Sequence, residues 1–152
     1  MTAPAATFLV IEDGREYIDR FTRLLGADFR FRFLRAGHAA EARALLAADA
    51  VAGLLLDLDF RRTPVQHLVD DDGHCGLSDH DRPRVAGVQG ILIARALRRA
   101  GVTLPALLFA DLEDPEQISF LQTDLAPLRV VPSSVGLQEI ARLLGGMAGA
   151  RP

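Results

Sequence analysis

Two apolar runs that each end in carboxylates constrain this chain most. The leucines at 54–56 lead directly into Asp57, and such a run is typical of a strand buried on both faces of a sheet. The apolar segment 8–11 has the same form, because Glu12 and Asp13 follow it. In open α/β sheets, the carboxyl ends of parallel strands meet at one edge, where ligands bind. We therefore expect Glu12, Asp13 and Asp57 to converge there.

Three carboxylates at one edge repel one another, so they stay ionised only when a cation or a basic side chain neutralises them. Oxygen ligands of this kind suit Mg²⁺, and we expect weak Mg²⁺ binding because the protein fixes few ligands. The alternative is that the acids only end their strands and mark solvated loops.

Composition narrows the class of protein. The chain has 152 residues, of which 49% are hydrophobic and 24% charged, which suits one globular domain, 1–152, with a substantial core. It has no apolar stretch of membrane-spanning length and no signal-peptide pattern, and its single cysteine fits a reducing compartment. We expect a cytoplasmic protein that does not bind membranes. A net charge of −3 without a basic stripe argues against a nucleic-acid partner.

Apolar periodicity divides the remaining chain into alternating strands and helices. Gly26 is expected to end the first helix, and Gly101 the third. Strands are predicted at 8–11, 29–33, 54–58, 104–110 and 128–131, and helices at 15–25, 39–48, 88–100, 115–121 and 137–144. This alternation predicts a doubly wound α/β fold, with a five-stranded parallel sheet and helices on both faces.

An acidic pair follows the first strand (Glu12 and Asp13), an aspartate follows the third (Asp57), and a proline follows the fifth (Pro132). In the order and spacing of these residues, the chain resembles the receiver domain of bacterial two-component response regulators, the family of the chemotaxis response regulator. The resemblance covers nearly the whole chain apart from one insertion. It implies that Asp57 accepts a phosphoryl group from a histidine kinase. It also implies that the acidic pair, Asp57 and the backbone carbonyl of Asp59 hold Mg²⁺.

Three positions depart from the family pattern. Ala110 stands where receivers have a threonine or serine, Val131 where they have a lysine, and Leu128 where they have an aromatic switch residue. The chain contains no lysine at all, and Arg129 reaches the site only if its side chain faces it. We therefore predict a receiver fold without the phosphorylation switch, which acts as a protein-binding module and not as an enzyme. A phosphorylatable stand-alone receiver in a phosphorelay is the alternative.

Receivers use a helix-strand-helix face for partners, and the resemblance places this face at 115–144. We expect a protein partner, either a histidine kinase or a downstream effector, or a second copy of the chain. The alternative is that the leucines of this segment only cover the sheet. An apolar centre with an arginine rim is predicted from Ile118, Leu121, Leu125 and Leu137 with Arg129 and Arg142.

The segment 60–84 has no counterpart in receivers and is longer than an ordinary connection. It is rich in aspartate and histidine and contains Cys75, but its spacing matches no zinc motif. A structural metal site, a lid or partner-contact loop, and a disordered loop all remain open. Since Asp57 precedes the segment, we expect it at the mouth of the acidic site, as a surface loop whose deletion spares folding.

An enzyme alternative starts from Asp57 and Asp59, because a strand that ends in Asp-x-Asp, with Thr63 beyond it, resembles the nucleophile motif of haloacid-dehalogenase-like phosphatases. Those enzymes carry the motif on the first strand and use a later lysine or arginine and an acidic pair. Here the motif follows the third predicted strand, and only a loose acidic match exists, formed by Asp111, Glu113 and Asp114.

Overall fold

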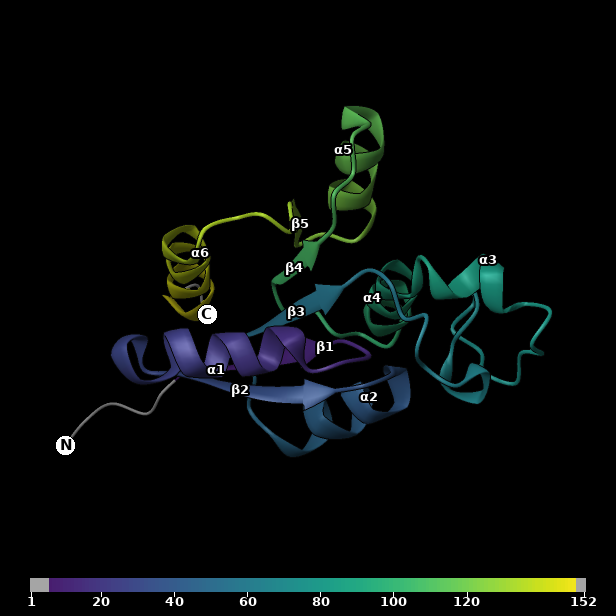
Figure 1. Cartoon of the computed structure of the whole chain (residues 1–152), viewed down its shortest axis with the longest axis horizontal. Coiled ribbons are helices and arrows are strands. Elements are labelled where there is room, and N and C mark those ends of the chain that lie inside the picture. The colour runs from purple at the N-terminus through teal and green to yellow at the C-terminus, as the bar shows by residue number, and fades with distance from the viewer. Residues whose placement is uncertain (1–5, 150–152) are drawn as a thin grey trace.

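A computed structural model describes residues 6–149 of the chain (Figure 1). Its centre is a five-stranded, all-parallel sheet with the strand order β2-β1-β3-β4-β5. This order confirms the predicted doubly wound α/β fold. The strands are β1 (Ala6–Ile11), β2 (Phe31–Ala36), β3 (Gly53–Asp57), β4 (Ala106–Phe109) and β5 (Leu128–Val131).

Helices cover both faces of the sheet because the buried strands alternate their side chains between two apolar cores. Leu54 and Leu56 belong to the core under α2, α4 and α5, whereas Leu55 belongs to the core under α1 and α6. The leucine run of β3 is therefore buried on both sides, as predicted. The helices are α1 (Glu16–Phe29), α2 (Ala39–Ala48), α3 (Arg82–Ala86), α4 (Gln89–Arg99), α5 (Pro115–Asp124) and α6 (Leu137–Gly149).

The boundary predicted at Gly26 is wrong. Helix α1 continues through this glycine to Phe29, and Arg30 ends it in a left-handed conformation with φ 61°. A glycine inside a helix costs only about 1 kcal/mol, and the buried Leu25 keeps the helix against the sheet. By contrast, the predicted ranges 39–48 and 128–131 match α2 and β5.

The insertion 60–84 is folded and lies beyond α4, at the end to which β3 points (Figure 1). It contains a short 3₁₀ helix (Val65–His67) and the start of α3. Its side chains Phe60, Leu68 and Val69 are buried in the same core as β3. The expectation of a surface loop is therefore wrong. That its deletion spares folding stays a prediction, which the burial of these side chains argues against because their removal would open the core.

A buried glutamine fastens the insertion to α4. The Gln89 side chain accepts a hydrogen bond from the backbone N–H of Val69 at 2.8 Å and donates to the carbonyl oxygens of Val69 (3.1 Å) and Val85 (3.3 Å). The buried amide therefore provides hydrogen-bond partners for three backbone groups, one N–H and two carbonyls, as buried polar groups require. The middle of the insertion is thus held by specific polar contacts as well as by apolar packing.

Within residues 6–149, no helix is both long enough and apolar enough to cross a bilayer.

Candidate acidic site at the carboxyl edge of the sheet

The ends of β1 and β3 bring Asp13, Asp57 and Asp59 to one edge of the sheet. Ile11 and Leu56 are register partners in these adjacent parallel strands, so the acids that follow them are neighbours. The three aspartates line an open cleft of about 250 Å³ together with Arg61 and Arg62. The sheet edge thus holds the carboxylate cluster and two cations of the insertion.

Glu12 does not line this cleft. Its buried carboxylate accepts the backbone N–H groups of Tyr17 at 3.1 Å (Oε1) and Ile18 at 2.8 Å (Oε2), and so caps the first turn of α1. Burial raises the pKa of Glu12 despite these two hydrogen bonds. The predicted convergence therefore applies to Asp13 and Asp57, while Glu12 is a helix cap, a role that follows from unpaired N–H groups at a helix start.

Asp13 is paired with an arginine of the insertion. Its side chain is only 4% exposed, and Arg62 contacts both of its oxygens, with the backbone N–H at 2.9 Å from Oδ2 and the guanidinium Nη2 at 3.3 Å from Oδ1. The same Nη2 lies 2.9 Å from Oε1 of Glu16. These acceptors, led by the Glu16 hydrogen bond, raise the pKa of Arg62. Part of the negative charge at the edge is therefore neutralised within the chain.

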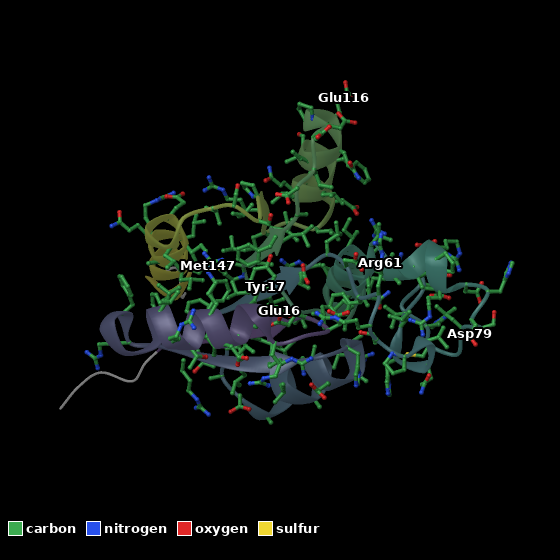
Figure 2. The ribbon with its side chains drawn as sticks, in the orientation of Figure 1. Glu16, Tyr17, Arg61, Asp79, Glu116 and Met147 are labelled. Atoms are coloured by element: carbon green, nitrogen blue, oxygen red, sulfur yellow. The ribbon has the colours of Figure 1, made fainter. Side chains whose placement is uncertain are left out.

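Asp57 lies between two clefts. In addition to the first, it lines a cleft of about 380 Å³ with Glu16, Tyr17, Arg20, Arg62 and Ser133. Figure 2 shows Glu16 and Tyr17 side by side at the start of α1, where Glu16 is exposed and Tyr17 is half-buried. Burial, reinforced by the charges of Asp13, Asp59 and Glu16, raises the pKa of Asp57 to about 6, although its Oδ1 accepts the Leu58 N–H at 2.9 Å.

Tyr17 forms one wall of this second cleft. Its ring stacks on Phe109 of β4 with centroids 5.0 Å apart. Burial, together with the nearby charges of Asp57 and Glu12, raises the pKa of the Tyr17 hydroxyl to about 12. The hydroxyl is therefore a neutral hydrogen-bonding group next to Asp57 at physiological pH.

The turn after β3 is shaped by a close backbone approach. The Gly90 N–H donates to the Leu58 carbonyl at 3.0 Å, and a Cβ atom at Gly90 would lie 1.9 Å from the carbonyl oxygen of Asp57. Only glycine allows α4 to begin at this distance from the strand. In the same turn, the Asp59 carboxylate contacts Arg61, with Oδ2 3.2 Å from the Nε atom.

The β4 and β5 side of the edge is apolar. Ala110 directly follows β4 and Val131 ends β5, and both side chains are buried. Leu128 is buried at the start of β5, at the opposite end of the strand. Arg129 is exposed and lines a cleft near Met147, so it lies away from Asp57. The three positions singled out from the sequence therefore present no hydroxyl, ammonium or aromatic group to the acidic site.

Carboxylate donors at this edge are the right chemical class for Mg²⁺. Asp13, Asp57 and the turn around Asp59 would hold the ion, which would screen the repulsion among the acids. Each carboxylate, however, already has a partner: Arg62 for Asp13, a backbone N–H for Asp57 and Arg61 for Asp59. The donor set fits a divalent cation, and an ion bound at Asp13 would compete with Arg62 for the carboxylate.

A second acidic cluster lies within the insertion. Asp70, Asp72 and His74 place potential ligand atoms within 4.8 Å of one another on the surface. Asp70 Oδ1 already accepts the N–H groups of Asp72 and His74, both at 2.9 Å. These bonds explain the local turn without a metal.

The residues of the predicted partner face separate into two groups. Leu121 and Leu125 are only 4% and 1% exposed and belong to the core under the sheet, so the prediction that they form an exposed apolar centre is wrong. They face the sheet because their spacing in α5 matches the buried stripe of a covering helix. Ile118 and Leu137 are half-buried, and Arg129 and Arg142 are exposed. Phe120 was not predicted as part of this face, and its side chain is 61% exposed on α5.

The residues of the phosphatase alternative each have other contacts in the structure, although Asp111 lies near the cleft of Asp57 through Ser133. Thr63 is buried in the insertion, and its carbonyl accepts Arg82 at 2.7 Å. Asp111 is bound to Ser133, whereas Asp114 caps α5 through the Glu116 N–H at 3.0 Å. Asp57 itself ends β3, at the centre of the sheet, and Asp59 lies two residues beyond it.

Two further arginines were not identified from the sequence. Arg35 of β2 donates to the carbonyl oxygens of Glu12 (3.1 Å), Asp13 (3.0 Å) and Gly14, and so fixes the loop that carries Asp13. Arg62 is 49 residues away from Asp13 in sequence. The alternation of phenylalanine and arginine around β2 signals an exposed strand face, but neither arginine has a local motif that signals its contact.

Neither protein-family models nor curated protein sequences match this chain. Solved structures do match. The receiver domain of the Francisella response regulator 1452 superposes with a TM-score of 0.67 and 11% identity, over 95% of this chain and 97% of that one. The signal receiver domain of NarL from Mycobacterium tuberculosis gives 0.66 and 17%, over 98% and 100%. The Vibrio cholerae chemotaxis protein CheY4 gives 0.65 and 14%, over 94% and 98%. The chain therefore has the fold of response-regulator receiver domains.

Proposed function

We propose that this protein is a signal-transduction module of the receiver type that binds a protein partner without a phosphorylation switch and without enzymatic activity. The observation that carries the proposal is the apolar half of the sheet edge. Ala110 and Val131 are buried where a receiver needs a hydroxyl and an ammonium group to meet a phosphoryl oxygen. Phosphorylation acts as a switch only when charged and hydrogen-bonding partners respond to the new charge.

The proposed contact surface is the exposed face of α5, β5 and α6, defined here by Ile118, Phe120, Arg129, Leu137 and Arg142. Phe120 supplies an aromatic anchor of the kind that dominates binding energy at interfaces. Next to this surface, an apolar cleft of about 410 Å³ is lined by residues that include Leu128, Leu143 and Met147. An exposed aromatic side chain on α5, together with an apolar cleft that Arg129 also lines, is the kind of surface found at protein interfaces. We propose a histidine kinase, a downstream effector or a second copy as the partner.

The test combines labelling with self-association. We expect acetyl phosphate to label Asp57 poorly, as measured by intact mass, and Asp57→Asn to leave partner binding unchanged. Sedimentation velocity should show an association that depends on protein concentration and not on acetyl phosphate. Phe120→Glu should abolish this association, whereas Leu24→Glu, which adds the same charge to an exposed position on α1, should not.

A phosphorylatable receiver is the second candidate, because Asp57 lies in an open cleft with Tyr17, Arg20 and Ser133. Stoichiometric labelling of Asp57, with large NMR shifts along β4 and β5, would favour this candidate over the interaction module. Hydrolysis of a generic phosphate ester, lost in Asp57→Asn, would instead favour a phosphatase. A monomer at all concentrations, with partner binding unaffected by Phe120→Glu, would remove the proposed surface.

A further inference from the structure

We propose that Arg62 is a tethered counter-ion of the acidic site, which competes with divalent cations for Asp13 and couples cation binding to the start of the insertion. This inference goes beyond the proposed function and does not depend on the partner. It begins from the burial of Asp13, whose side chain is 4% exposed while that of Arg62 is 64% exposed. The arginine thus covers the carboxylate from the solvent side.

The contact uses both the backbone and the side chain of Arg62. The backbone N–H occupies Oδ2 of Asp13 and the guanidinium lies against Oδ1, so both oxygens have donors. A charge-assisted pair of this kind is stronger than a neutral hydrogen bond. An ion that replaces Arg62 at Asp13 displaces the guanidinium from Oδ1, because two cations repel each other at one buried carboxylate oxygen. It also takes Oδ2, the acceptor of the Arg62 backbone N–H.

Displacement of Arg62 would be transmitted along the insertion. The neighbouring Thr63 N–H donates to the Phe60 carbonyl at 3.1 Å, and Arg82 donates to the carbonyl oxygens of Thr63 (2.7 Å) and Arg61 (3.4 Å). Segment 60–63 is therefore linked to α3, whereas Val69 is held independently by Gln89. Cation binding should therefore loosen the contacts between segment 60–63 and α3 and leave the hydrogen bond between Val69 and Gln89 intact.

The first experiment measures Mg²⁺ binding to the full chain and to Arg62→Gln. The chain has one tyrosine and no tryptophan, so the fluorescence of Tyr17 reports on the cleft that contains Asp57 and Arg62. Titration with MgCl₂, repeated by calorimetry, should show Mg²⁺ affinity about tenfold higher in Arg62→Gln. Arg15→Gln is the matched control, because it removes the same charge from an exposed pair with Asp19. This control should change the affinity by no more than about twofold.

The second experiment follows hydrogen exchange in the unmodified protein as MgCl₂ is added. The Arg62 amide should exchange at least about tenfold faster when the ion takes its acceptor, while the Val69 amide should be unchanged. Three outcomes of the binding experiment would overturn the proposal: Mg²⁺ affinity that is equal in Arg62→Gln and the unmodified chain, an equal rise in affinity in Arg15→Gln, or no Mg²⁺ binding to Arg62→Gln. In the exchange experiment, an Arg62 amide that stays protected at saturating Mg²⁺ would also overturn it. These outcomes are independent of phosphodonor labelling and of self-association.

Discussion

The two halves of the carboxyl edge of the sheet differ in chemistry although they belong to one fold. The β1 and β3 half presents Asp13, Asp57 and Asp59 around a cleft, whereas the β4 and β5 half ends in the buried Ala110 and Val131. Counter-charge for the acids comes from Arg61 and Arg62 in the insertion and not from β5. One edge of a single sheet can therefore hold a cluster of acids on one side and apolar side chains on the other.

The largest change in stability is expected from a substitution that disrupts the close packing at the acidic half. Gly90→Ala places a methyl group against the Asp57 carbonyl, which should lower the free energy of unfolding by about 3 kcal/mol. Chemical denaturation measures this loss. Gly145→Ala is the control, since a Cβ there meets nothing within 4 Å and should stabilise the helix by about 0.5–1 kcal/mol. Equal effects of the two changes would show that the acidic half is not tightly packed.

Asp57→Asn tests the charge of the acidic half, with EDTA present. The pKa of Asp57 is raised from 3.8 to about 6, so between these values the folded state binds more protons than the unfolded state. The free energy of unfolding should therefore fall as pH rises from about 4 to about 6. Removal of the charge should stabilise the protein at pH 7 by about 2 kcal/mol and flatten this part of the pH profile.

The control for Asp57→Asn is Asp59→Asn, because the Asp59 side chain is 44% exposed and is paired with Arg61. It should change the stability at pH 7 by less than about 0.5 kcal/mol. If the free energy of unfolding of Asp57→Asn changed with pH in the same way as that of the unmodified protein, the pH dependence would not be due to Asp57.

Polar groups introduced into the apolar half test whether the difference between the two halves limits phosphorylation of Asp57. The double variant Ala110→Thr, Val131→Lys supplies a hydroxyl and an ammonium group, which should raise the labelling of Asp57 by acetyl phosphate at least about tenfold. Intact mass against time gives the rate. The control pair Ala110→Val, Val131→Met adds bulk without polar groups and should leave labelling unchanged. A folded double variant that labels no faster would show that the missing groups do not limit the reaction.

The smallest change in stability is expected for Arg61, which distinguishes it from Arg62 at the acidic half. Arg61 and Asp59 form an exposed pair, with 77% and 44% of their side chains accessible. Arg61→Gln should therefore change the free energy of unfolding by less than about 0.5 kcal/mol. Thermal denaturation at low and high salt measures it. A loss well above 1 kcal/mol that disappears in high salt would mean that Arg61 also holds the site together.

The sequence by itself determined the fold and the place of the site. Leucines 54–56 require burial on both faces, and the alternation of strands and amphipathic helices leaves a doubly wound sheet as the arrangement that buries them. The acids after β1 and β3 must then meet at one edge. These features are predictable because they depend on periodicity and on residues close in sequence.

Only the tertiary structure decided which groups those acids contact. Glu12 turns inward to cap α1, because the first N–H groups of the helix need acceptors, and Asp13 meets Arg62 from 49 residues away. The burial of Leu121 and Leu125, and of Phe60 in the insertion, likewise depends on how elements pack. Such pairings depend on the reach and direction of side chains from distant elements, which no local pattern encodes.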